Sequence, residues 1–283
     1  MFVLLDRFVF ENYLRNHETL YFVNDINIIL LQINMYYLSV IASLKNETMN
    51  LKIWIEHYLW QGVEHFYLID NDSDDNPLSI LQEYIDNGIV TYYFLPEKHK
   101  QVDHYRYVFD NANLKNETFW LAVCDLDEFF FGVDKNLKIK LRTLEEHYDY
   151  ILCNWKMFGS DGHKTHPEDI RRDIIFRKQD LSTNTKYIFK PQILVNTSSI
   201  WLHQLNDIFI ERNVVANEII HLNHYPIQSL EFFQKVKIPR GDAFNPDSDN
   251  VRDMSYFNSY DTEECRDEIL KNLIINPPDD YTE

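Results

Sequence analysis

Cysteine is scarce in this chain, which has only three among its 283 residues, at Cys124, Cys153 and Cys265. They lie far apart, and none belongs to a CxxC pair. The sequence therefore offers neither a disulfide framework nor a zinc knuckle. Such sparse and unpaired cysteines are typical of proteins in a reducing compartment.

Positive charge is also in short supply. The chain has 27 Lys and Arg against 45 Asp and Glu, which gives a formal net charge of −18. An acidic surface of this kind repels phosphate backbones, so we exclude nucleic acid as a partner. A small anionic ligand stays open, because it needs only a local group of cations or a bound metal ion.

No targeting or membrane-spanning segment is recognisable. A secretory signal needs an uninterrupted apolar core, whereas the N-terminal stretch contains Asp6, Arg7 and Glu11. The most apolar run, Ile26–Ala42, is short for a membrane span and is interrupted by amide side chains. We expect it to be a lead-in followed by a core strand, with no integral membrane span. We therefore expect a cytoplasmic protein, and association with an organelle stays open.

Linkers rich in glycine, serine or proline are missing as well, and the sequence has no internal repeat. We therefore predict an N-terminal extension over residues 1–36 and a single domain over residues 37–283. Within the domain, the pattern of elements changes near Gly132. We divide it there into a first half, 37–132, and a second half, 133–283.

The first half alternates between strand and helix patterns. The predicted strands are Tyr37–Ser43, His65–Asp70, Ile89–Phe94 and Phe119–Cys124. Between them, apolar stripes at helical spacing predict helices over Asn50–Gly62, from Pro77 to Gly88, and around Val102–Ala112. Strict alternation of this kind implies right-handed crossovers and a parallel sheet. We predict an α/β fold with a mostly parallel central sheet flanked by helices.

The alternation fades in the second half. LRTLEEHY predicts a short helix and SLEFFQKVKI a late one, whereas PPDDYTE resembles a frayed tail. Four segments predict shorter strands in antiparallel or mixed pairing, namely YILCNWKMF, KYIFKPQILV, SIWLHQL and EIIHLNHY. This half is therefore expected to be a mixed or antiparallel part of the fold.

Polar side chains follow three of the predicted parallel strands. Lys45 and Glu47 come after the first, Asp70 after the second, and Asp125 and Asp127 after the fourth. In parallel sheets, ligands lie beyond the carboxyl ends of the strands, so these residues are expected to share one site. Asp70 and Glu47 could instead have a purely structural role. Asp often caps turns, and Glu near the start of a helix interacts favourably with the helix dipole.

The strongest local motif is LAVCDLDEFFFG, which spans Leu121–Gly132. In an extended segment, residues i and i+2 point to the same side, so Asp125 and Asp127 face one ligand while Leu126 returns to the core. Carboxylates this close repel each other unless a cation holds them. Mn²⁺ or Mg²⁺, which prefer oxygen ligands, are the natural cations. The alternative is that one aspartate caps a turn and the other is solvated.

Several stretches together resemble the glycosyltransferase family 2-like and family 92 group. They are VIASLKNETMNLKIWIEHYLWQGVEHFYLIDNDSDDNP, CDLDEFFF, NWKMFGSDGHKTHPE and HLNHYPIQSLEFFQKVKIPRG, within residues 37–241. The resemblance implies a GT-A fold, a Rossmann-like sheet that binds a nucleotide-sugar, first of all a UDP-sugar, with a divalent metal. It implies transfer of the sugar, with inversion, to a glycan, glycoprotein or lipid-linked acceptor. Residues 37–132 would then bind the donor, and residues 133–283 would form the acceptor side.

The resemblance also suggests roles for donor-side residues. Glu47 and Asp70 would contact the nucleoside, Asp125 the ribose or the metal, and Asp127 the metal directly. Lys45 shares their edge of the sheet and is a further candidate for donor contact.

Enzymes of this fold commonly take another metal ligand from a histidine in the second half. Two histidines match the pattern, His203 in IWLHQ and His224 in LNHYP, and we favour His203 slightly. Lys237 and Arg240 would place cations on the diphosphate. Gln228 stands where the group usually has a lysine, so no phosphate contact is expected at that point.

An inverting transferase needs a base to deprotonate the acceptor hydroxyl. Asp161, in FGSDGH, stands where the motif of the group borders the acceptor side, and it is our candidate. Ordinary turn chemistry is the alternative for an aspartate before glycine.

Two other functions fit part of the sequence. CDLDEFF resembles the motif of haloacid-dehalogenase-type phosphatases, in which the first aspartate is the nucleophile and the second an acid and base. That motif normally follows the first strand of its domain, whereas here three strand-helix units precede it. The other alternative is a catalytically inactive carbohydrate-binding relative, which would keep the sheet and lose the base.

Overall fold

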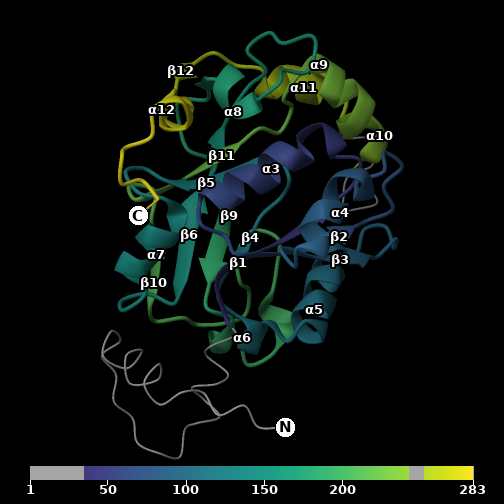
Figure 1. Cartoon of the computed structure of the whole chain (residues 1–283). Coiled ribbons are helices and arrows are strands. Elements are labelled where there is room, and N and C mark those ends of the chain that lie inside the picture. Colours follow the sequence, from purple (N-terminus) through teal and green to yellow (C-terminus); the bar gives the residue numbers. More distant parts are fainter. Residues whose placement is uncertain (1–34, 242–251, 283) are drawn as a thin grey trace, which may run out of the picture. The chain divides into compact units, whose positions relative to one another are not determined.

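The four strands predicted in the first half form neighbouring strands of one seven-stranded sheet. The computed structural model describes residues 35–241 and 252–282 (Figure 1). In the sheet, β1 (Tyr36–Leu44) lies between β2 (His65–Asp70) and β4 (Thr118–Val123), and β3 (Val90–Phe94) lies beyond β2. All three of these pairings are parallel.

Helices cover both faces of this sheet. The connections are α3 (Thr48–Trp60), α4 (Leu78–Asp86), α5 (Gln101–Asn111) and the short α6 (Leu114–Glu117). Side chains alternate along β1, so Val40 packs in one core with Trp54 of α3, whereas Ile41 packs in another with Tyr105 of α5. The two helices therefore lie on opposite faces of the sheet, and the predicted α/β fold is confirmed.

The second half extends the sheet with mixed pairing. Strand β9 (Thr185–Phe189) is antiparallel to β4 and to β6 (Tyr150–Asn154), and β10 (Asn213–Val215) runs parallel to β6. A separate three-stranded sheet contains β5 (Glu128–Gly132), β11 (Ile220–His224) and β7 (Lys156–Met157). The helix α7 (Leu137–Leu144) follows β5. The predicted mixed part of the fold is confirmed.

Two predicted strands differ in detail. The segment SIWLHQL is not a strand but an irregular stretch after a 3-10 turn, η2 (Thr197–Ser199), and another 3-10 turn, η1 (Pro191–Ile193), follows β9. The segment YILCNWKMF breaks at Trp155, so that β6 joins the large sheet and β7 the small one. Trp155 therefore lies where the chain passes between the two sheets.

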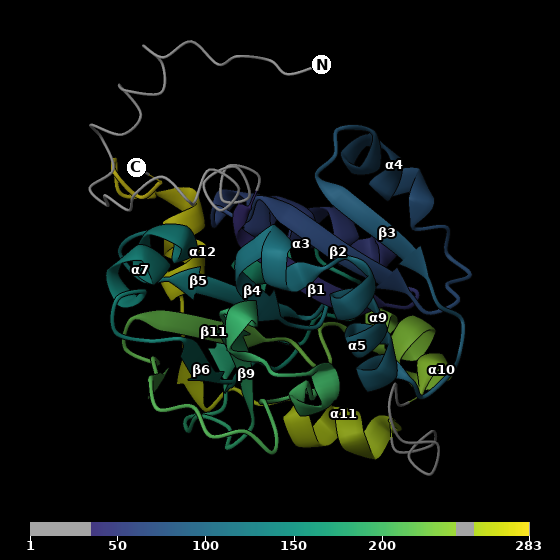
Figure 2. The ribbon, with the colours of Figure 1, turned by 90° about the horizontal axis from the view of Figure 1, so that it is seen from below.

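The late helix has three parts, α9 (Leu230–Phe232), the π-helical segment η3 (Phe233–Lys237) and α10 (Ile238–Arg240). Its Phe233 packs against Phe257 of α11 (Met254–Tyr260), and both views place the two helical regions close together (Figures 1 and 2). The remaining short elements are α8 (Ile170–Asp173), β8 (Phe176–Arg177), which pairs with β12 (Cys265–Arg266), and α12 (Ile269–Ile275).

The expectation of a frayed C-terminal tail is wrong as far as Tyr281. This side chain is 1% exposed, its ring stacks on Trp60, and its hydroxyl donates to the Gly132 carbonyl oxygen at 2.8 Å. Because polar residues precede Tyr281, the sequence gives no sign that its ring is buried. The Asn136 N–H also donates to the Tyr281 carbonyl oxygen, and Lys135 Nζ to the Asp280 carbonyl oxygen, so the buried ring and these hydrogen bonds together hold the segment against the domain.

The predicted extension, residues 1–36, lies almost entirely outside the described residues, as does the first part of the apolar run Ile26–Ala42. Its second part forms β1, which is a core strand. The proposed boundaries between extension, first half and second half stay predictions. Within the described ranges, no helix combines the length and apolar character needed to cross a membrane.

Candidate active site

A cavity of about 530 Å³ opens at the carboxyl ends of β1 and β4. After β1 the chain moves to β2 and β3 on one side, and it later returns to β4 on the other side. Ligands of open α/β sheets bind at such a reversal of strand order. The predicted site residues that line this cavity are Lys45, Glu47, Asp125, Asp127, His203, His224, Lys237 and Arg240.

The loop that carries the two aspartates is held by the helix beneath it. Trp54 Nε1 of α3 donates to the carbonyl oxygens of Asp125 and Glu128, both at 3.1 Å. The Tyr58 hydroxyl, from the same helix, donates to the Glu128 carbonyl oxygen at 3.0 Å and accepts from the Phe130 N–H at 3.0 Å. Because these donors and acceptors are buried, the backbone from Asp125 to Phe130 has a single arrangement.

Asp125 is paired with a lysine that the sequence analysis missed. Lys186 of β9 is completely buried, and its Nζ lies 2.8 Å from Asp125 Oδ2, while Gln101 Nε2 donates to Oδ1 at 2.9 Å. Burial opposes the charge of Asp125, but the Lys186 ammonium outweighs it, so the pKa of Asp125 lies below its usual value. The side chain is still 33% exposed and can accept a further hydrogen bond from a ligand. The signal for Lys186 was a charged residue in an otherwise apolar strand.

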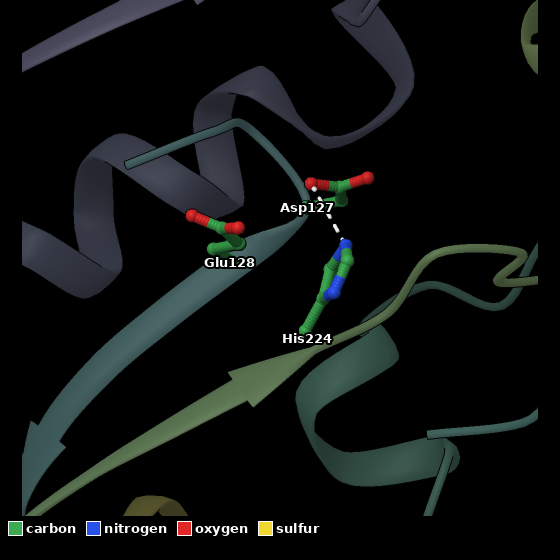
Figure 3. A group of neighbouring side chains, drawn as sticks. All are labelled: Asp127, Glu128 and His224. Atoms are coloured by element: carbon green, nitrogen blue, oxygen red, sulfur yellow. Dashed lines mark ion pairs between the residues drawn. The ribbon is translucent and has the colours of Figure 1, made fainter. Parts of the chain in front are cut away.

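Asp127 lies between a lysine and a histidine. Its Oδ2 is 2.5 Å from Lys237 Nζ, and its Oδ1 is 3.6 Å from His224 Nε2. Burial would raise the pKa of Asp127, but Lys237 and His224 outweigh it and hold that pKa well below its ordinary range. The register of β5 and β11 explains why His224 lies next to Asp127, because His224 pairs across the two strands with Glu128, the residue after Asp127. Figure 3 shows Asp127 and His224 turned toward each other at the ends of these strands.

A third carboxylate, Glu128, lies next to this pair. It is completely buried, its Oε2 accepts from the Asp125 N–H at 2.9 Å, and its Oε1 has no hydrogen-bond partner among the described residues. Burial raises the pKa of Glu128 well above its usual value, although Lys186 Nζ, 3.7 Å from Oε2, acts in the opposite direction. Asp127, Glu128 and His224 offer ligand atoms within 4.8 Å of one another, the arrangement expected of a metal site.

These residues fit a divalent ion in part. Asp127 and His224 face each other at a separation that one ion can bridge, and His224 Nδ1 has no hydrogen-bond partner among the described residues. Glu128 fits less well, because its Oε2 already accepts from the Asp125 N–H and lies 3.7 Å from Lys186 Nζ. Lys186 and Lys237 already neutralise the two aspartates. The expectation of a metal ion relied on repulsion between the two aspartates. Because the two lysines already balance their charge, this repulsion does not by itself require an ion.

Two further cations lie on the wall of the cavity. Arg240 pairs with Glu47, whose side chain is only 2% exposed, and Lys237 Nζ is 3.7 Å from the same carboxylate. The Lys45 ammonium donates to the Asn71 carbonyl oxygen at 2.8 Å. Gln228, by contrast, is completely buried and accepts a hydrogen bond from Asn50 Nδ2 at 2.6 Å, and it does not line the cavity.

Both candidate histidines contact Trp155. The ring centroids of Trp155 and His224 are 4.3 Å apart, and those of Trp155 and His203 are 5.1 Å apart. Burial and the nearby Lys186 lower the pKa of His203. The structure brings His224, and not His203, next to Asp127. The geometry therefore favours His224 as the candidate metal ligand, whereas the sequence led us to prefer His203. Trp155, which forms part of the cavity wall, was not anticipated as a site residue.

Asp161 and Asp70 do not line the cavity. Asp161 Oδ2 accepts from the Ile175 N–H at 2.6 Å and Oδ1 from the Phe176 N–H at 3.1 Å, and burial raises the pKa of this carboxyl. Asp70 accepts from the Ser73 N–H at 2.9 Å and from the Tyr92 hydroxyl at 2.6 Å. Both carboxylates bind the protein itself. The position of Asp161 gives no support to its expected role as the base.

Comparison with known proteins identifies a family for this chain. The family model for glycosyltransferase family 92 matches residues 40–273. A family 92 protein of Ricinus communis is 27% identical over 216 residues, which cover 70% of this chain and 36% of the relative. One of Arabidopsis thaliana is 25% identical over 219 residues, with the same coverage. This chain therefore spans about a third of the length of the curated relatives that it matches.

Two solved structures of S. aureus TarS are similar to this chain. One, a complex with UDP, has a TM-score of 0.43 and 15% identity, and the match covers 78% of this chain and 70% of that chain. The other has a TM-score of 0.41 and 14% identity, and it covers 85% of this chain and 72% of that chain.

Proposed function

Because the chain belongs to glycosyltransferase family 92, we propose that it moves a sugar from a nucleoside-diphosphate sugar to an acceptor hydroxyl. The donor we expect first is a UDP-sugar. One observation carries the proposal. A single cavity at the reversal of strand order gathers the facing pair Asp127 and His224 and the cations Lys237 and Arg240. Its volume of about 530 Å³ lies within the range of small-molecule sites.

The cations suit the diphosphate of such a donor. Arg240 offers a planar set of N–H donors for phosphate oxygens, and the buried Glu47 holds it in position. Lys237 adds a second positive charge within reach of the same cavity. Asp125 keeps a partly exposed carboxylate that can accept hydrogen bonds from ribose hydroxyls.

Metal dependence is part of the proposal. Asp127 and His224 would hold Mn²⁺ or Mg²⁺, with Asp125 and His203 as weaker candidates. A divalent ion, when bound, neutralises charge that develops on the departing diphosphate. Lys237, which already contacts Asp127, would add its own charge to that side of the donor.

In the proposed reaction, the acceptor oxygen forms a bond to the anomeric carbon while the bond from that carbon to the diphosphate oxygen breaks. Attack from the side opposite the leaving group inverts the configuration. The acceptor is a glycan, a glycoprotein or a lipid-linked sugar. The phosphatase alternative lacks support, because the DLDE motif follows β4 rather than a first strand.

The experiment is a donor screen with the purified chain. UDP release is followed for a panel of UDP-sugars, each mixed with a panel of p-nitrophenyl glycosides as acceptors, with Mn²⁺, with Mg²⁺ and with a chelator, and each reaction is repeated with the D127N variant. We expect release from at least one donor, which stops with the chelator and in the variant. Release of inorganic phosphate from p-nitrophenyl phosphate would instead support the phosphatase. Binding of UDP-sugars without any release would support an inactive relative.

A further inference from the structure

A second cavity, of about 280 Å³, lies beside the donor cavity. The two share a wall made of Trp155, Met157, Asn184 and Tyr260. A molecule in the smaller cavity would therefore lie next to whatever occupies the larger one. A transferase needs this arrangement, because two substrates must meet at one bond.

The lining of the smaller cavity is suited to a carbohydrate. Trp155 and Tyr260 offer aromatic surface on which the apolar face of a sugar ring can pack, and Lys178 Nζ lies over the Tyr260 ring at 4.7 Å. Ser182 and Asp180 add polar groups for sugar hydroxyls. The lining is more polar than apolar, which suits the many hydroxyl groups of a carbohydrate.

Two carboxylates line this cavity, and they differ in their contacts. Glu264 accepts hydrogen bonds from the Gln179 N–H at 3.0 Å and from Thr262 Oγ1 at 3.1 Å. The side chain of Asp180 is exposed and has no hydrogen bond or ion pair within residues 35–241 and 252–282. Asp180 is therefore the carboxylate of this cavity that is available to a ligand.

The segment that carries Asp180 is nevertheless fixed on both sides. The Lys178 N–H donates to the Met157 carbonyl oxygen, and the Ser182 N–H donates to the Trp155 carbonyl oxygen, both at 2.9 Å. Trp155 and Met157 belong to the wall shared with the donor cavity. The loop with Asp180 is thus hydrogen-bonded directly to the element that separates the two cavities.

We propose that the smaller cavity is the acceptor subsite of this chain and that Asp180 is the general base. This inference rests on the proposed function. Asp180 takes the proton of the acceptor hydroxyl, whose oxygen bonds to the anomeric carbon. The bond from that carbon to the diphosphate breaks, and its electron pair leaves with the diphosphate. Asp180 replaces Asp161, whose carboxylate binds backbone N–H groups instead.

The base is tested by Asp180→Asn with the best UDP-sugar from the donor screen and a panel of p-nitrophenyl glycosides as acceptors. We expect transfer to fall by about 10²–10⁴-fold, with the thermal shift by UDP unchanged. Formate, as a small external base, should restore part of the activity of Asp180→Ala. Asp86→Asn is the control, because Asp86 is exposed on α4 and lines neither cavity. Transfer by Asp180→Asn at the control rate would overturn the assignment, as would a large loss in Glu264→Gln alone.

The subsite is tested by filling it. Ser182 lines the smaller cavity and not the larger one, so Ser182→Trp should raise the acceptor KM strongly and leave the thermal shift by UDP unchanged. An unchanged acceptor KM in an active enzyme would overturn the subsite alone. If the wild-type chain releases UDP from no donor, the proposed function fails, and the assignment of the subsite and base fails with it.

Discussion

Two acidic clusters follow parallel strands of the same sheet and look alike in the sequence. Residues 70–75, which we call the β2 cluster, come after β2, and residues 125–128, the β4 cluster, come after β4. Their carboxylates have different partners. In the β2 cluster, Asp70 and Asp75 bind backbone and hydroxyl groups. In the β4 cluster, Asp125 and Asp127 face buried cations at the edge of a cavity.

The β2 cluster serves the fold. Asp75 Oδ2 accepts from the Thr48 N–H at 2.9 Å and from its hydroxyl at 2.7 Å. Thr48 begins α3, and the preceding Glu47 makes no side-chain cap of its own. Asp75 therefore caps this helix from a distant part of the sequence. Asp70 similarly closes its own turn through the Ser73 N–H.

The β4 cluster lies at a cavity. Asp125 and Asp127 each meet a lysine ammonium that is almost fully buried, and both line the cavity. A carboxylate held charged beside a cavity is available to a ligand, whereas one saturated by backbone N–H groups is not. Asp161 belongs with the carboxylates that are already bound by backbone N–H groups, since it accepts from two of them outside the cavity.

The largest effect is expected when the cation of the β4 cluster is removed. Lys186→Met leaves Asp125 without its buried partner, and loss of one member of a buried pair costs about 3–5 kcal/mol. Urea unfolding measures the change in the free energy of unfolding. Lys52→Met is the matched control, because Lys52 is 68% exposed and its pair with Glu56 should contribute at most about 0.5 kcal/mol. Equal stabilities of the two variants would contradict the pairing.

Asp127→Asn should affect catalysis more than stability. Without the charge that faces Lys237 and His224, UDP release is expected to fall by about 10²–10³-fold. The extra thermal shift that Mn²⁺ gives in the presence of UDP should also disappear. Asp74→Asn, an exposed aspartate in the β2 cluster, is the matched control. Equal activity in the two variants would remove the distinction between the clusters.

Asp161→Ala should affect stability and leave catalysis intact. Two buried backbone N–H groups lose their acceptor, which we expect to cost about 1–3 kcal/mol in urea unfolding. Transfer, measured at a temperature where the variant is folded, should proceed at about the wild-type rate. A loss of about 10²-fold or more at unchanged stability would return Asp161 to the role of base.

Asp75→Ala should give the smallest effect, the loss of one helix cap. We expect the free energy of unfolding to fall by about 0.5–2 kcal/mol, with the affinity for UDP unchanged. Thr48→Val, which removes the hydroxyl partner but keeps the N–H, should cost less than Asp75→Ala. The reverse order would show that the hydroxyl, not the cap, carries the contribution.

The sequence predicted the first half of the fold well because its signals are local. The strand HFYLID and the helix that ends near Gly62 follow from side-chain periodicity and end residues alone. The second half was harder, because its strands are short and pair with distant segments. Whether IWLHQ forms a strand depends on the segments that lie beside it in the fold, and the periodicity of its own side chains does not reveal them.

The residues of the candidate site also fall into those that a local motif marks and those that depend on distant segments. Asp125 and Asp127 were found because a local motif at a strand end marks them. Lys186 was missed because its partner lies on another strand, and the preference for His203 over His224 ignored the register of β5 and β11. Asp161 was misjudged because a carboxylate before glycine looks the same whether it faces a cavity or a backbone N–H.

The central claim is that the β4 cluster, and not the β2 cluster, receives the diphosphate of a nucleotide-sugar together with a divalent ion. A crystal of the chain soaked with UDP and Mn²⁺ tests it most directly through the anomalous signal of manganese. We predict one manganese peak in contact with Asp127 and His224, with the diphosphate beside Lys237 and Arg240. UDP bound at Asp70 and Asp75, or manganese far from Asp127, would contradict the account.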